Sequence, residues 1–218
     1  MKMDVELLDR YSPIIYFDEK EPFFPVLVGA TIIKEACQSP SMLKRYITFD
    51  PSQVSFVIEY AIYFDYDIVH MYELEHFWVY VGHEGEVVYA EASYHGDYNN
   101  VLLAGGQNIQ QRTHVEIYSQ PGKHAFASSV DELRKIPNLY QETNENAGKG
   151  GLMVPDLLAG SYNTNEEIDQ KAAAYLQSFK FKPSMQFQPY RIPVSLYMEW
   201  NELAEEIPRR IKRLLSKM

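Results

Sequence analysis

Val54-Ser-Phe-Val-Ile-Glu-Tyr-Ala-Ile-Tyr63 is the stretch of this 218-residue chain that indicates its fold most directly. Apolar side chains recur at every second position of the stretch, at Val54, Phe56, Ile58, Tyr60 and Ile62. A period of two is typical of a β-strand that buries one face. The pattern therefore predicts an extended strand, which needs partner strands from other parts of the chain.

Partner strands are predicted downstream. The residues from Glu75 to Val81 alternate in the same way, and the short turn Gly82-His83-Glu84-Gly85 leads into a further strand from Glu86 to Tyr94. Another strand is predicted from Thr113 to Ser119, because a turn sequence containing proline and glycine follows it. The middle third of the chain is thus expected to be antiparallel β-structure.

Helices are expected at the edges of this region. Two serine or threonine residues stand three positions before a glutamate, which is the spacing of a capping box at the start of a helix. These pairs are Ser129 with Glu132, before a helix over 130–135, and Thr164 with Glu167, before a helix over 165–179.

The C-terminal segment from Met198 to Leu215 is helical in pattern, although Pro208 removes a backbone donor and is expected to kink or split it. The sequence therefore predicts a mainly β protein, an antiparallel β-sandwich with peripheral helices and a helical C-terminal tail. We expect residues 1–160 to form the sandwich and residues 161–218 a helical extension packed on it.

Composition narrows the range of partners. Thirty acidic against twenty basic residues give a formal net charge of -10, which opposes binding to nucleic acid or to an anionic membrane. No apolar run approaches the eighteen residues of a membrane span, so no stable membrane insertion is expected. Cys37 is the single cysteine and the N-terminus lacks the apolar core of a secretory signal, which predicts a cytoplasmic protein. The oligomeric state stays open.

The histidines suggest a metal site. All six fall between His70 and His124, and the first opens the stretch His70-Met-Tyr-Glu73-Leu-Glu75. Side chains two apart on an extended backbone share a side, and carboxylates so close repel unless a cation or a proton intervenes. The alternative is a surface loop whose acids face water. The predicted ligands are His70, Glu73 and Glu75 with Asp65 or Asp67 from just upstream.

Oxygen-rich ligation favours a hard divalent cation, Mg²⁺, Ca²⁺ or Mn²⁺, with Zn²⁺ also possible. Two further histidines, His95 and His124, each follow a predicted strand. If these strand ends meet the first hairpin, the two imidazoles join the carboxylates and become candidates for acid/base catalysis. Each alone more often bonds backbone or water. The chain has no Gly-x-Ser-x-Gly nucleophile elbow.

In these segments the chain resembles the β-sandwich superfamily of necrosis-inducing toxin-like proteins and the related vacuolar-sorting-associated proteins. The spacing His70-x-x-Glu73-x-Glu75 matches the motif whose histidine, aspartate and glutamate hold a divalent cation in the toxins. Three further blocks occur in the family's order, namely Tyr11-Ser-Pro-Ile-Ile-Tyr-Phe-Asp-Glu-Lys-Glu-Pro-Phe-Phe-Pro25, Ser93-Tyr-His-Gly-Asp-Tyr98 and Val115-Glu-Ile-Tyr-Ser-Gln-Pro-Gly-Lys-His124-Ala125.

The resemblance implies a metal-bearing sandwich over roughly residues 11–155, with His70, Glu73 and Glu75 as ligands and His95 and His124 lining the same cavity. The chain departs from the toxins at the motif itself. Glu73 and Leu74 replace aspartate and tryptophan, and the paired cysteines are missing. Toxin activity on plant membranes is therefore not expected.

Three functions remain open. The first is a non-catalytic module that binds a small polar ligand or glycan, a sugar or a phospho-headgroup, at a divalent cation. Its aromatic walls are expected from Tyr63, Tyr72, Tyr94 and Tyr98. The second is a metal-dependent hydrolase that uses His95 or His124 as acid or base. The third is a structural or interaction protein in which the acids and histidines satisfy one another.

Overall fold

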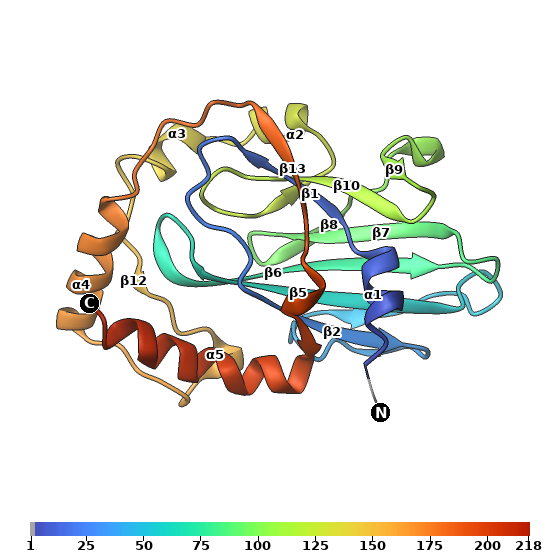
Figure 1. Ribbon diagram of the computed structural model, residues 1–218, viewed down its shortest axis with the longest axis horizontal. Coiled ribbons are helices and arrows are strands. Elements are labelled where there is room, and N and C mark those ends of the chain that lie inside the picture. Colours follow the sequence, from blue (N-terminus) through green and yellow to red (C-terminus); the bar gives the residue numbers. More distant parts are fainter. Residues whose placement is uncertain (1–2) are drawn as a thin grey trace.

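A long antiparallel strand pair, β5 (Phe56–Tyr66) and β6 (His70–Val81), forms the centre of the molecule (Figure 1). The computed structural model describes residues 3–218 and shows a mainly β protein. Tyr60 lies opposite Phe77 in the register of the pair. The strand predicted from the alternation over 54–63 is thereby confirmed, although β5 begins at Phe56 and continues to Tyr66.

Seven strands form the larger sheet, in the order β14-β2-β5-β6-β7-β8 with β12 beside β6. The pairs β14 with β2 and β12 with β6 are parallel, and the others are antiparallel. The remaining bounds are β2 (Leu27–Ile33), β7 (Val87–Tyr94), β8 (Asp97–Asn100), β12 (Gly151–Leu152) and β14 (Tyr197–Glu199).

Five strands form the second sheet, in the order β11-β10-β1-β13 with β9 beside β10. Their bounds are β1 (Ile14–Asp18), β9 (Ile109–Gln110), β10 (His114–Ser119), β11 (Phe126–Ala127) and β13 (Phe187–Arg191). Strands β1 and β10 pair in parallel, so both sheets are mixed and not purely antiparallel as expected. About one hundred residues separate β1 from β10, so no hairpin forces the two strands to be antiparallel. Their relative direction could therefore not be predicted from their spacing in the sequence.

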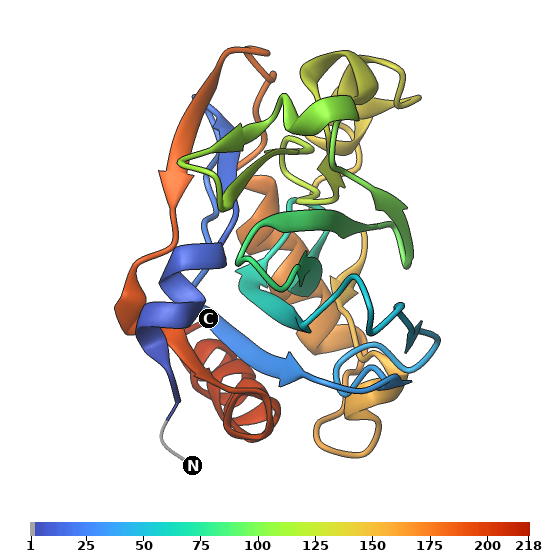
Figure 2. The same cartoon turned by 90° about the vertical axis from the view of Figure 1, so that its right-hand side faces the viewer.

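The two sheets face one another and enclose the main core (Figure 2). Even-numbered residues of β5, including Ile58 and Phe64, contribute to this core together with Phe77 of β6 and Ile15 and Ile117 of the second sheet. A small hairpin of β3 (Cys37–Gln38) and β4 (Tyr46–Ile47) contributes Ile47 to a separate cluster with Trp78 on the outer face of the larger sheet.

The C-terminal helix α5 (Trp200–Leu215) packs on the outer face of the larger sheet. Gly29 of β2 permits this close approach, because a Cβ there would lie 2.9 Å from Leu203. Pro208 lies inside one uninterrupted helix, so the predicted split is wrong. The flanking buried residues Ile207 and Ile211 hold both halves on the sheet despite the lost backbone bond.

The other helices are short or peripheral. In α4 the cap is Asn165, whose side chain accepts the backbone N–H of Ile168, and not Thr164 as predicted. Ser129 caps α2 by accepting from Glu132, as predicted. No helix within residues 3–218 is long and apolar enough to cross a membrane. The bounds are α1 (Val5–Tyr11), α2 (Val130–Arg134), α3 (Leu139–Glu142) and α4 (Glu166–Gln177), with 3-10 turns η1 (Ala104–Gly106), η2 (Asp156–Leu158) and η3 (Val194–Leu196).

The C-terminal part is more than a helical extension. Strand β13 adds to the second sheet and β14 adds to the larger one, so residues beyond 160 complete both layers of the sandwich. The helical prediction for 161–218 missed these strands because each contains only a few residues, three in β14.

Candidate metal centre

Asp67 closes the turn between the two central strands. One carboxylate oxygen, Oδ1, accepts the backbone N–H groups of Val69 and His70, each at 2.6 Å. The other oxygen, Oδ2, lies 3.2 Å from Nε2 of His70. The side chain therefore shapes the turn with one oxygen and presents the other to the site.

An irregularity at Tyr72 brings His70 and Glu73 to the same face of β6. Residues three apart on a regular strand point to opposite faces. Tyr72 has a positive φ of 77°, which L-residues rarely adopt, and this interrupts the alternation. Met71 and Leu74 consequently pack in the cluster on the outer face.

The imidazole of His70 is held with one ring nitrogen free to coordinate. Its Nδ1 lies 2.8 Å from the carbonyl oxygen of Tyr72, an acceptor, so Nδ1 carries the proton and Nε2 presents a lone pair. Burial lowers the pKa of His70, which keeps the ring neutral near pH 7. An outer hydrogen bond of this kind is the usual support of a metal-binding histidine.

Asp67, His70 and Glu73 together form a group that could hold a metal ion, since one donor atom from each lies within 4.8 Å of the others. Asp67 and His70 are buried and Glu73 is half-buried. Burial, helped by the charges of Glu75 and Asp67, raises the pKa of Glu73 well above its usual range. Carboxylates gathered in this way are stabilised by a cation.

Lys123 also reaches this group, and sequence reasoning missed it. Its ammonium pairs with Asp67 and lies 3.3 Å from Nε2 of His70. The lysine stands in the turn after β10, directly before His124. The turn meets the loop between β5 and β6, a condition that the sequence left open, and the side chain that reaches the group is that of Lys123 and not that of His124.

Glu75 lies two residues further along β6 and has a different partner. Its carboxylate accepts the hydroxyl of Ser93 from β7, and that hydroxyl oxygen in turn accepts the backbone N–H of His76 at 2.6 Å. Burial raises the pKa of Glu75 to about 7. Glu75 therefore lines the site beside the three-residue group without belonging to it.

Asp65 lies outside the group, so of the two aspartates predicted as alternative ligands the group contains Asp67 and not Asp65. Phe64 faces the core between the sheets, so the next residue of the strand faces the outer side. There the carboxylate of Asp65 makes a bidentate ion pair with Arg210 of α5. The Nε and Nη2 atoms of the arginine lie 2.5 and 2.7 Å from the two carboxylate oxygens. This aspartate fastens the C-terminal helix to the sheet.

The two further histidines have separate positions. His95 is exposed and lines the same cleft as Glu73. His124 is fully buried, with its ring stacked on Phe64 at 4.0 Å and its Nε2 3.2 Å from Glu21. The expectation that both line the cavity is therefore wrong for His124, which the core encloses.

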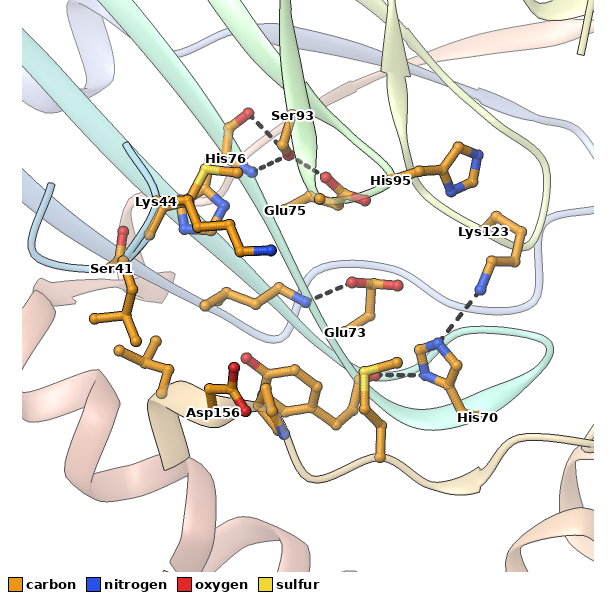
Figure 3. A pocket seen from close by; sticks show the side chains of 18 residues that line it. Ser41, Lys44, His70, Glu73, Glu75, His76, Ser93, His95, Lys123 and Asp156 are labelled. Atoms are coloured by element: carbon orange, nitrogen blue, oxygen red, sulfur yellow. Dashed lines mark hydrogen bonds between the residues drawn. The ribbon is translucent and has the colours of Figure 1, made fainter. Parts of the chain in front are cut away.

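The group opens into a cleft of about 500 Å³. Figure 3 shows His70, His95 and Lys123 on one side of it and Ser41 and Lys44 on the opposite side. Of the four tyrosines expected as walls, only Tyr72 lines the cleft. Tyr63 is buried, the ring of Tyr94 packs against His95, and Tyr98 lies against Arg45. Apolar lining comes from Met42, Leu43, Leu74, Met153, Pro155 and Leu157.

Fold and site thus define a mainly β protein with a possible metal-binding group of two carboxylates and one imidazole. No protein-family model, no curated protein and no solved structure matches the chain. The resemblance to the necrosis-inducing toxin-like superfamily therefore stays a prediction.

The pKa of Glu75 predicts how the stability of the metal-free protein depends on pH. Its folded-state pKa of about 7 lies above the ordinary 4.5, so folding favours the protonated acid. This contribution is fully present below pH 4.5 and is lost as the pH rises through about 7. A cation at the neighbouring group favours the ionised acid, so we expect the loss to shrink when a divalent ion is present.

Thermal unfolding across this pH range, with chelator and with added Ca²⁺, measures the effect. The chelated protein should lose stability toward neutral pH and the calcium-loaded protein should lose less. Parallel pH profiles in the two conditions would show that no cation interacts with these acids.

Proposed function

We propose that the protein is a metal-dependent binding module, in which a divalent cation at Asp67, His70 and Glu73 presents open coordination positions to a polar ligand in the cleft. One observation carries the proposal. The three donors converge within 4.8 Å, and the hydrogen bond from Nδ1 of His70 to Tyr72 leaves Nε2 available as a ligand.

The donor set favours a hard cation. Two carboxylates and one imidazole suit Mg²⁺, Ca²⁺ or Mn²⁺, and the same set is also compatible with Zn²⁺. Hard cations take six or more ligands, so three protein donors leave positions for water or for a ligand oxygen. The proposed ligand is a sugar or a phospho-headgroup, because both offer oxygen donors and fit a cleft of about 500 Å³.

Calorimetric titration of chelator-treated protein with each of these ions tests the proposal. We expect one ion to bind with a stoichiometry of one at micromolar to millimolar concentration, and to raise the melting temperature by linkage. If none of the four ions binds or changes the melting temperature, the acids and histidine satisfy one another and the function lies elsewhere.

A metal-dependent hydrolase is the second candidate, and the position of His95 favours it. This side chain lines the cleft and is exposed in part, and the partial desolvation by its neighbours lowers its pKa, so the neutral form that accepts a proton predominates near pH 7. The structure removes His124 from this role, because the ring is enclosed in the core.

Screening phosphate and carboxylate esters with and without chelator distinguishes the two candidates. A hydrolase should turn over at least one ester in a metal-dependent reaction that a His95→Ala variant loses. Cation binding without turnover supports the binding module. If turnover is unchanged by the chelator and by the His95→Ala substitution, the reaction takes place at another site.

A further inference from the structure

The ammonium of Lys123 stands where a cation bound to the three-residue group would stand. It pairs with Asp67 Oδ2, the oxygen that the turn leaves free, and lies 3.3 Å from Nε2 of His70, the nitrogen that carries the lone pair. The side chain is only 13% exposed. Lysine and metal ion therefore need the same donor atoms.

The backbone holds this lysine in place. The turn that carries Lys123 is fixed to the turn that carries Asp67, because Ile68 donates its N–H to the carbonyl of Gly122 at 2.6 Å. Gly122 in turn donates its N–H to the buried carboxylate of Glu21 at 2.7 Å. These two hydrogen bonds fix the position of the turn, and the turn places the ammonium of Lys123 at the site.

We infer that Lys123 determines the ion selectivity of the site, because its ammonium and a bound cation exclude one another among Asp67, His70 and Glu73. The inference rests on the proposed function. Two cations at the same donors repel, so an incoming ion must displace the ammonium. Glu142 of α3 is another carboxylate close enough to attract the displaced side chain.

Displacement makes the site select doubly charged ions. Sodium or potassium brings a single charge, which the tethered ammonium already supplies, so exchange gains no electrostatic attraction. A divalent ion carries a second charge, so the two carboxylates and the lone pair of His70 attract it more strongly than they attract the ammonium. This stronger attraction favours replacement of the ammonium by the ion. Lys123 thereby lowers the affinity for every cation but excludes monovalent ions most effectively.

A Lys123→Met variant tests the inference, with Lys135→Met as the control, because Lys135 follows α2 at the surface and pairs with the exposed Glu132. Calorimetry with Ca²⁺ near neutral pH should show affinity at least about tenfold higher in Lys123→Met, since removing a competing unit charge is a large effect at such short range. The control should match the wild type. Replacing choline by sodium at constant ionic strength should weaken Ca²⁺ binding in Lys123→Met and not in the wild type.

The outcomes separate this inference from the proposed function. If neither wild type nor variant binds Ca²⁺, Mg²⁺, Mn²⁺ or Zn²⁺, the proposed function fails and the inference with it. If the wild type binds an ion and Lys123→Met binds it equally or more weakly, the inference alone is overturned.

A second measurement uses the wild-type protein and does not depend on the variant folding. Amine acylation followed by mass spectrometry reports how accessible each lysine is. Lys123 should be protected in the chelated protein and become several-fold more reactive with a saturating divalent ion, while Lys44 stays unchanged. Equal reactivity of Lys123 in the ion-saturated and chelated protein would contradict displacement.

Discussion

Replacing Asp67 with asparagine is expected to weaken divalent-cation binding by at least about two orders of magnitude, because outer-shell partners of a metal alone are worth about 10- to 100-fold. The substitution keeps the local backbone hydrogen bonds. An asparagine oxygen can still accept the two backbone N–H groups that Oδ1 accepts, so the turn is kept. The substitution removes the charged oxygen that faces His70, and with it the ion pair to Lys123.

Asp65→Asn is the matched control for this prediction. The control removes the same charge two residues away, from a carboxylate that binds Arg210 on the outer face. Asp65→Asn should bind the ion with wild-type affinity, although the lost ion pair lowers stability. Calorimetry measures the affinity of both variants for the divalent ion. Equal affinities of the two variants, whether high or low, would show that Asp67 is not a specific ligand of the ion.

Arg45→Met is expected to lower the free energy of unfolding by about 3–5 kcal/mol, the usual cost of breaking a buried ion pair by removing one partner. The guanidinium pairs with Glu91 and donates to the hydroxyl of Tyr80 at 2.9 Å. It also lies 3.6 Å over the ring of Tyr98. Both charged side chains are nearly buried, at 6% and 11% exposure, so water cannot replace the lost partner of Glu91.

This ion pair also positions one wall of the cleft. Arg45 follows directly on Ser41 to Lys44, which line the cleft. The same segment is fastened a second time, by the hydroxyls of Ser39 and Ser41, both of which donate to the buried carboxylate of Glu59. Loss of Arg45 should therefore loosen the wall as well as the fold.

Chemical denaturation of Arg45→Met measures the change, with Arg209→Met as the control. Arg209 pairs with glutamates on the exposed side of α5, where ion pairs contribute less than about 1 kcal/mol. If the two variants lose similar stability, the network around Glu91 does not anchor the β3–β4 hairpin.

The central strands could be predicted from sequence because their alternation is determined by one buried face. The strands β13 and β14 could not, since such short segments join a sheet through partners far away in sequence. Helix α5 continues through Pro208 for a related reason. Packing of Ile207 and Ile211 outweighs a local backbone preference, and packing is not visible in one segment alone.

The site was predictable in part. Clustered histidines and paired acids pointed to Asp67, His70 and Glu73, and the structure brings these three together. The alternation of β5 excludes Asp65, but only once the strand is known to extend to Tyr66. The positive φ of Tyr72 has no signal in its residue type, because glycine or asparagine normally occupies that conformation.

Lys123 and His124 show a second limit of the sequence. Their turn was expected to reach the site, but which of two neighbours points inward depends on the hydrogen bonds between the turn, Ile68 and Glu21. The sequence therefore assigned His124 to the cavity, whereas the side chain that reaches the three-residue group from this turn is that of Lys123.

A crystal of the protein soaked with Mn²⁺ and measured for anomalous scattering tests the central claim most directly. We predict one strong peak bounded by Asp67, His70 and Glu73, with the side chain of Lys123 moved away from Asp67. Saturating Mn²⁺ that gives no peak among these three residues, and leaves the lysine paired with the aspartate, would contradict the account.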